Sequence, residues 1–205
     1  MKKNRRNRKN KNAIILGGIT AAIIVIGIVF AVLSGRMTIN PSIDRLPDDY
    51  SLEDAKKDGC VIYDVKNFSQ SNSTMEISHG QKKWDSFIKS TQFKIPCAVR
   101  LVLNEGNEKL TIYDLSYDGK DYELKFVKYG KLVSETYRYL LKSEEVPPIP
   151  SISTLEKRVI YFLADDPDLT WTAAVQSSQK EEVEGTKAYR YFRVYSKSFY
   201  KSTEN

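Results

Sequence analysis

Residues 60–103 decide the predicted fold, because they are patterned as a strand, a helix and a second strand. The stretch begins CVIYDV at residues 60–65 and ends CAVRLVL at residues 97–103, and each end carries apolar residues at every second position. Between the two ends, the side chains that share one helical face are Trp84, Phe87, Ile88 and Thr91. A crossover of this kind places its two strands parallel in one sheet.

Cys60 and Cys97 stand at the beginnings of the two predicted strands. If the strands are neighbours, their separation of about 5 Å permits a disulfide between these residues. The alternative is a pair of buried thiols, since an unoxidised cysteine packs as a small hydrophobic residue. Two cysteines and the single histidine, His79, are too few ligands for a metal site. The sequence therefore predicts no metal and no cofactor.

Downstream of this unit, strands alternate with turns. Asp118-Gly119 is a strong tight-turn signal between two predicted strands. A nearly continuous apolar run over Arg158–Ala164 is typical of a central strand. The remaining predicted elements are strands over Leu110–Tyr117, Tyr122–Lys128, Glu135–Lys142 and Ala188–Ser196, a polar loop over Asn67–His79, and a helix capped by Asp168.

Upstream, Ser51 is a predicted N-cap and Gly59 ends the short helix that follows it. The predicted fold class is α+β, with one domain over residues 51–197. We expect a mixed β-sheet of about six to seven strands, with two to three helices packed mainly on one face. Residues 34–50 are predicted as a juxtamembrane linker and residues 198–205 as a C-terminal tail.

Ahead of the linker lies AIILGGITAAIIVIGIVFAVL, an uncharged apolar run of 21 residues from Ala13 to Leu33. Roughly 20 apolar residues in a helix span the hydrocarbon core of a bilayer. Residues 1–12 carry seven Lys and Arg and no acid, and such a cluster stays on the cytoplasmic side. The sequence therefore predicts a basic cytoplasmic tail at residues 1–12, a single transmembrane helix at residues 13–33, and an extracellular domain held at the cell membrane.

A cleaved signal peptide is the alternative interpretation of this segment. Its apolar core usually has about 7–15 residues, and the observed run is too long, although Val32 and Ser34 suit a cut at Gly35. The residues before Arg36 are similar to the approach to a bacterial lipoprotein cysteine, but arginine offers no thiol for a lipid. We therefore expect the helix to be retained as a signal anchor.

The apolar run contains small residues at four-residue spacing. Such pairs let two helices approach closely and support dimers in lipid, but they are also common in helices that have no partner. The sequence leaves open a weak homodimer. The pairs that would form its face are Gly17 with Ala21, Gly18 with Ala22, and Gly27 with Ala31.

The net charge of +6 comes from the tail, because the rest of the chain carries 25 basic and 26 acidic residues. A nearly neutral domain does not grip nucleic acid by charge, so no nucleic-acid partner is expected. A basic tail of this kind orients the chain at the anionic inner leaflet. The partners that we expect are the membrane and a protein or cell-wall component.

Several short motifs occur along the chain: Asp58-Gly59, Trp84–Ile88, the strand with Arg100, Tyr113–Leu115, Tyr117–Lys120, Ser177–Gln179 and a Tyr-rich last strand. Together they resemble a family of small envelope proteins of Gram-positive bacteria (Bacillota), mostly predicted lipoproteins, that is known only as a domain of unknown function. The resemblance spans roughly residues 48–197 and departs at Arg36, where the family has its lipid-bearing cysteine. It implies an envelope location and a globular domain, and it implies no activity.

No group of residues predicts catalysis. His79 lies beside Ser78 and near Asp85, but a hydrolase triad also needs mutual reach, and the sequence has no Gly-x-Ser-x-Gly elbow. The acidic run 165–168 lacks the alternating oxygens, central glycine and distal glutamate of a calcium loop. The sequence therefore favours a protein that is not an enzyme, with an envelope hydrolase of unrecognised site and an accessory subunit of a membrane complex as alternatives.

The last predicted strand interleaves aromatic and basic residues. If it is exposed, one of its faces forms a platform for a glycan, a peptide or a protein partner. The alternative is that the tyrosine rings cover the core while arginine extends to water. The platform residues are Tyr189, Tyr191, Arg193 and Tyr195. We expect a non-catalytic binding domain on the outer face of the membrane.

Overall fold

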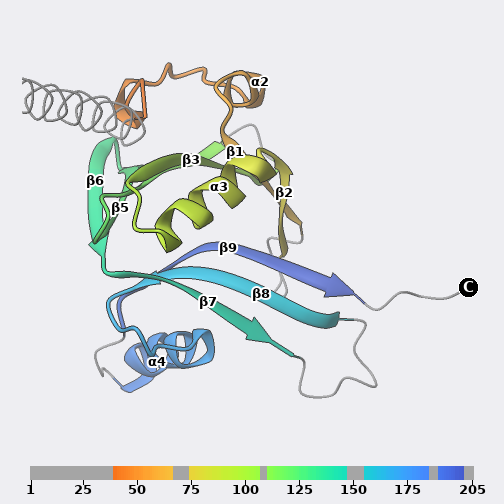
Figure 1. Ribbon diagram of the computed structural model, residues 1–205, viewed down its shortest axis with the longest axis vertical. Coiled ribbons are helices and arrows are strands. Elements are labelled where there is room, and N and C mark those ends of the chain that lie inside the picture. The colour runs from red at the N-terminus through yellow and green to blue at the C-terminus, as the bar shows by residue number, and fades with distance from the viewer. Residues whose placement is uncertain (1–38, 67–73, 107–109, 147–154, 185–188, 201–205) are drawn as a thin grey trace, which may run out of the picture.

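The computed structural model describes residues 39–66, 74–106, 110–146, 155–184 and 189–200. These residues form an α+β domain with a six-stranded mixed sheet, a three-stranded sheet and three α-helices (Figure 1). In chain order the elements are the 3-10 helix η1 (Ile43–Arg45), α2 (Leu52–Lys57), β1 (Val61–Lys66), β2 (Thr74–His79), α3 (Gln81–Gln92), β3 (Cys97–Asn104), β4 (Leu110–Tyr117), β5 (Tyr122–Lys128), β6 (Lys131–Tyr137), β7 (Tyr139–Glu145), β8 (Leu155–Ala164), α4 (Trp171–Glu184) and β9 (Tyr191–Tyr200).

The six-stranded sheet has the order β2-β1-β3-β4-β5-β6. β1 and β3 are parallel neighbours joined through α3, which confirms the predicted crossover, and the other pairs are antiparallel. β2 lies within the segment that was predicted as a polar loop. Only Met75 and Ile77 on this edge strand pack into the core, so its apolar pattern is too short to be read from the sequence.

A second sheet, β7-β8-β9, begins where one strand was predicted over Glu135–Lys142. The structure divides that segment at Arg138 into the end of β6 and the start of β7. Tyr137 is buried at the edge of the first sheet, whereas Tyr139 pairs with Ala164 in the second. Because Tyr137 and Tyr139 are two residues apart, the sequence predicted that they share one face of a single strand. The chain instead passes from one sheet to the other between them.

The main core lies between the two sheets and contains α3. Trp84 and Phe87 of α3 are 2% and 3% exposed, as their helical spacing predicted. Burying each such side chain contributes about 1.5–3 kcal/mol. The ring of Tyr63 on β1 stacks on Tyr195 of β9 with 5.2 Å between centroids, and Trp84 meets Tyr195 edge to face at 5.8 Å. Aromatic contacts therefore join the first sheet, the helix and the second sheet.

The three helices occupy three different faces, which corrects the prediction that they pack mainly on one. α3 lies between the sheets, α2 covers the outer face of the six-stranded sheet through Ala55, and α4 covers the outer face of the three-stranded sheet through Ala174 (Figure 1). The reason is the second sheet, which was not predicted and supplies an additional face for a helix. α2 begins with the predicted N-cap, a capping box in which Ser51 and Asp54 each accept the other's backbone N–H.

Residues 39–50, which we call the strap, pack on the outer face of the six-stranded sheet. Ile43 of η1 is 6% exposed, and η1 contacts β4, β5 and β6. The Pro41 carbonyl accepts a hydrogen bond of 2.6 Å from Arg100 Nη2 on β3. This part of the predicted linker therefore belongs to the domain, and at the other end β9 continues to Tyr200.

Residues 1–38 lie outside the described part of the chain. The basic tail, the predicted transmembrane helix and its small-residue pairs therefore stay predictions. Within the described residues, no helix has the length and apolar character needed to span a membrane.

Candidate functional site

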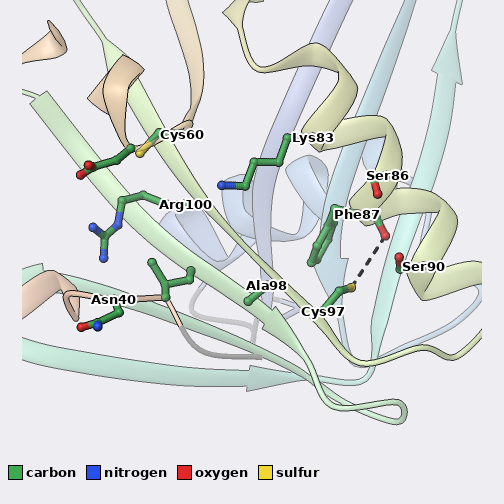
Figure 2. A pocket seen from close by; sticks show the side chains of 11 residues that line it. Asn40, Cys60, Lys83, Ser86, Phe87, Ser90, Cys97, Ala98 and Arg100 are labelled. Carbon is green, nitrogen blue, oxygen red and sulfur yellow. Dashed lines mark hydrogen bonds between the residues drawn. The ribbon is translucent and has the colours of Figure 1, made fainter. Parts of the chain in front are cut away.

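A polar cleft of about 490 Å³ opens beside the beginnings of β1 and β3 (Figure 2). One wall is the strap at Asn40, a second is the loop after α2, and a third is one side of α3. The side chains that line it are Ile39, Asn40, Asp58, Cys60, Lys83, Ser86, Phe87, Ser90, Cys97, Ala98 and Arg100.

Helical spacing brings the α3 residues to the cleft. Lys83, Ser86 and Ser90 are three and four residues apart, so they share one side of the helix next to the buried side of Trp84. Gly80 precedes the helix with φ +81°, and a Cβ at this position would lie 2.5 Å from the Cys60 carbonyl oxygen. Only glycine permits this close approach, which places α3 against the start of β1.

Lys83 joins the helix wall to the loop after α2. Its Nζ donates a hydrogen bond of 2.8 Å to the Gly59 carbonyl, and the side chain is directed across the cleft in Figure 2. The loop has a second connection, because Tyr50 Oη donates to Asp58 Oδ2 at 2.8 Å. The cleft walls are therefore connected by polar contacts between the strap, the loop and the helix.

The base of the cleft contains a buried ion pair. Arg100, 3% exposed, donates from Nε to Asp114 Oδ1 at 2.6 Å and from Nη2 to Asp114 Oδ2 at 2.8 Å. Burial lowers the pKa of Arg100, but the hydrogen bonds and charge of Asp114 outweigh it and raise the pKa overall. Because Nη2 also binds the Pro41 carbonyl, the same guanidinium holds the strap in place.

Cys60 and Cys97 are both buried thiols, which is the alternative that the sequence left open, and the structure does not form the possible disulfide. The strands are parallel neighbours as expected, but their register aligns Val61 with Leu101, so Cys60 lies level with Arg100. Cys97 is three residues farther back, about 10 Å along the strand, whereas a disulfide needs Cα atoms within about 7 Å.

The two thiols also face opposite sides of the six-stranded sheet. Cys60 packs in the outer core with Ala55, and Cys97 packs in the inner core, where its Sγ donates to the Phe87 carbonyl at 3.8 Å. Burial raises the pKa of the Cys60 thiol. The reactive thiolate is therefore disfavoured at Cys60, because a raised pKa keeps the proton on sulfur.

The cleft is suited to binding a polar ligand. Hydroxyls of Ser86 and Ser90 and the ammonium of Lys83 supply donors, while Asp58 supplies a carboxylate. Among the side chains that line the cleft, Cys60 and Arg100 have raised pKa values, which favour their protonated forms. Neither shift gives a group that exchanges a proton near neutral pH, which a general acid or base requires.

The four predicted platform residues do not share one exposed face, because a β-bulge interrupts β9. Tyr195 pairs with Tyr161 while Arg193 pairs with Phe162, so Val194 is an extra residue between them. The bulge reverses the alternation of side chains after Val194. The interpretation that the tyrosines cover the core is therefore the one that the structure favours for this strand.

Each platform residue has its own surroundings. Tyr195 is 4% exposed, and burial raises its pKa to about 12. Tyr191 packs edge to face on Trp171 of α4, with 5.5 Å between centroids. Arg193 is half-buried, and burial together with the charge of Arg158 lowers its pKa. Of the four, Tyr189 alone is well exposed, and it lies two residues before β9 begins.

The remaining candidates from the sequence are separated from the cleft. Ser78 and His79 are exposed at the end of β2, and Asp85 accepts a hydrogen bond from Gln81 on α3. In the acidic run, Asp165 pairs with Arg190 at 3.0 Å, and Asp166 accepts the Asp168 backbone N–H at 2.9 Å. The α4 N-cap hydrogen bond comes from Thr170, whose Oγ1 accepts from Ala173 N, and not from Asp168 as predicted.

Sequence reasoning missed the cleft, although one signal pointed to it. Arg100 and Asp114 are single charged residues within otherwise apolar strands, and a buried charge requires a partner. Opposite charges on consecutive antiparallel strands therefore predict a buried pair. Comparisons of the chain with protein-family models, with curated proteins and with solved structures found no match.

Proposed function

We propose that this protein is a single-pass, membrane-anchored envelope protein whose extracellular α+β domain binds a polar partner in the cleft. The observation that carries the anchoring is the uncharged run of 21 residues that follows a tail with seven basic residues and no acid. The resemblance to the Gram-positive envelope family supports the same location.

The chemistry of the cleft supports binding in preference to turnover. Its polar side chains come from the strap, the loop after α2, α3 and β3, and these segments border a volume of the size that small ligands occupy. Partners of matching chemistry are a peptide segment or a cell-wall glycan, both of which offer hydroxyl, amide and carboxylate groups. An envelope hydrolase remains the alternative, and it requires a turnover that one side-chain change in the domain removes.

The test is a crosslinked pull-down of the full chain from its native membranes. A copy in which an unrelated transmembrane helix replaces residues 13–33 is compared with the natural chain. A partner retained by both copies supports a binding domain, whereas a partner lost with the foreign helix supports an accessory subunit that acts through its helix. Membrane extraction of the natural chain tests the anchor, because a chain released by carbonate is not a transmembrane protein.

A matched pair of α3 variants tests whether the cleft carries the binding. Ser86→Trp fills the cleft, and Lys89→Trp adds the same side chain at an exposed position of α3 that does not line it. We expect the first variant to lose the partner and the second to retain it. Equal retention by both variants would place the binding elsewhere on the domain.

A further inference from the structure

The turn between β5 and β6 presents apolar side chains to water at the end of a hairpin. Tyr129 is 92% exposed, and Val127 and Leu132 beside it are 46% and 43% exposed. We call residues 127–132 the hairpin tip. Scattered exposed apolar residues are ordinary, but three within six residues, one of them a protruding aromatic ring, form a surface that favours a less polar environment.

The backbone of the hairpin tip is not explained by folding alone. Tyr129 and Gly130 form the two-residue loop with φ +52° and φ +70°, both in the left-handed region. Loops of this kind favour asparagine, aspartate or glycine at the first position, because a bulky side chain there is strained. Burial of the Tyr129 ring offsets little of this strain, because the side chain is almost fully exposed. Strain of this kind is characteristic of positions that are kept for function.

The side chains of the hairpin tip are arranged as in a membrane-interface anchor. Val127 pairs with Leu132 across the hairpin, and Lys128 pairs with Lys131, so the aliphatic pair and the basic pair point to opposite faces of the ribbon. The Lys128 Nζ lies 5.5 Å from the centroid of the Tyr129 ring. Tyrosine prefers the boundary between headgroups and acyl chains, and lysine extends its ammonium to the phosphates there.

The hairpin tip lies at the end of the domain to which the strap leads. η1 of the strap contacts both β5 and β6, and Figure 1 shows the start of β6 beside η1. A groove of about 780 Å³ connects the two regions and is lined by Leu46 and Pro47 of the strap together with Val127 and Tyr129. The strap therefore passes beside the hairpin tip after it enters the domain at the cleft.

The length of chain between the apolar run and the strap limits the distance to a bilayer. Leu33 ends the run, and Pro41 is held on the sheet by Arg100. Eight residues extend at most about 28 Å. The headgroup layer itself occupies several ångströms of that distance. A helix that spans the membrane therefore holds Pro41 within about 28 Å of the hydrocarbon core. The strand register places Lys125 level with Arg100, so Tyr129 lies four residues, about 13 Å, farther along the sheet, and the hairpin tip is within reach of the lipid surface.

The geometry points to a phospholipid surface as the occupant of the hairpin tip: Tyr129, Val127 and Leu132 enter the headgroup boundary, with Lys128 and Lys131 at the phosphates. This inference rests on the proposed membrane anchor and adds a second contact that orients the domain. Asp48 and Asp49 of the strap are also exposed, and their negative charges offset those of Lys128 and Lys131. The apolar side chains therefore contribute more to lipid binding than the net charge does.

The experiment uses the full chain in phosphatidylcholine vesicles that contain a fraction of phosphatidylglycerol. Tyr129→Cys carries an aromatic, environment-sensitive fluorophore whose rings stand in for the tyrosine ring, and Val146→Cys, an exposed position after β7, carries the same fluorophore as the control. Cys60 and Cys97 are 1% and 7% exposed, so labelling of the unsubstituted chain gives the background. Headgroup-labelled quencher lipids are expected to quench the probe at 129, with a blue shift of its emission, and to leave the probe at 146 unquenched.

Substitutions at the hairpin tip test its chemistry with the probe moved to Leu132→Cys. Tyr129→Trp is expected to retain quenching and Tyr129→Asn to lose it, since asparagine suits the backbone but has no ring. Lys128→Glu and Lys131→Glu are each expected to reduce the ratio of docked to undocked hairpin by about fivefold. Quenching that is the same in the Tyr129→Asn and Tyr129→Trp chains would overturn the role of the ring.

The outcomes separate this inference from the membrane anchor. If the chain floats with the vesicles but the probes at 129 and 146 are quenched equally, the docking of the hairpin tip is overturned and the anchor is retained. A chain that does not float with the vesicles overturns the anchor itself. Flotation together with quenching at 129 alone supports both.

Discussion

The two turns at the ends of β5 differ in what their side chains contact. At one end, Asp118 Oδ1 accepts the backbone N–H groups of Lys120 and Asp121 at 2.7 and 2.8 Å. Beneath that turn, the rings of Tyr117 and Tyr122 pack with 4.6 Å between centroids. At the other end, the Tyr129 ring extends into water from a left-handed backbone position.

This difference separates a turn that serves folding from one that serves contact. The Asp118 turn satisfies its own backbone groups and covers buried rings, which stabilises the hairpin. The hairpin tip has strain and exposed apolar area, which the fold does not need. Changes at the first turn should therefore lower stability and leave the membrane contact, and changes at the second should remove the membrane contact without lowering stability.

The largest expected effect comes from the buried pair that holds the strap near the hairpin tip. Asp114→Asn leaves the Arg100 guanidinium buried without a counter-charge, which typically costs about 3–5 kcal/mol. Urea unfolding of the full chain in detergent micelles measures this loss. The hairpin tip would also lose its defined position relative to the chain that joins the strap to the predicted transmembrane helix. Quenching of a probe at 129 should therefore fall.

An apolar replacement of the same pair is the control. Arg100→Met combined with Asp114→Leu removes both charges, and such replacements are often neutral for stability. It also removes the donor to the Pro41 carbonyl. We expect the double variant to be more stable than Asp114→Asn while the strap is released. A double variant as unstable as the single one would show that the charge pair is not the main source of the loss.

The next effect is at the turn that serves folding. Asp118→Ala removes the acceptor of two backbone N–H groups and should lower the free energy of unfolding by about 1–2 kcal/mol. Those hydrogen bonds hold the pKa of Asp118 below its ordinary value of 3.8. Its stabilisation is therefore present above that pH and is lost as the pH falls through the lowered pKa.

Urea unfolding at a series of pH values checks this prediction. The natural chain and Asp118→Ala should differ at neutral pH and converge only at pH values below the lowered pKa of Asp118, where the carboxyl is protonated in both the folded and the unfolded state. Quenching of a probe at the hairpin tip should be the same in both chains. A pH-independent difference would assign the loss to the backbone of the turn and not to the carboxylate.

The turn at Asp118-Gly119 and the unit β1-α3-β3 were both predicted from the sequence, because short-range patterns determine both. Asp118-Gly119 between alternating strands is a local signal, and Trp84, Phe87 and Ile88 repeat at helical spacing within twelve residues of helix. Ser51 was likewise recognised from its own neighbours. Local chemistry is sufficient where the partners of a residue lie within a few positions of it.

The features that were missed depend on pairing between distant segments. The register of β1 against β3 decides that Cys60 lies level with Arg100 and not with Cys97, and no local pattern reports it. Division of the predicted strand at Arg138 depends on which sheet receives each half. The bulge at Val194 reverses the faces of β9 in the same way. The cleft is formed by segments brought together through these pairings, so its residues could not be grouped from the sequence.

The smallest expected effect is also the sharpest, because stability and contact should change in opposite directions. Tyr129→Asn places a residue that tolerates the left-handed region at φ +52°, so the folded domain should gain about 0.5–1 kcal/mol. The same change removes the exposed ring, so quenching by headgroup-labelled lipid should be lost. Tyr129→Trp keeps both the strain and a ring that prefers the interface, and it should leave both measurements near those of the natural chain. If Tyr129→Asn instead destabilised the domain, the ring would have a role within the fold, and the distinction between the two turns would fail.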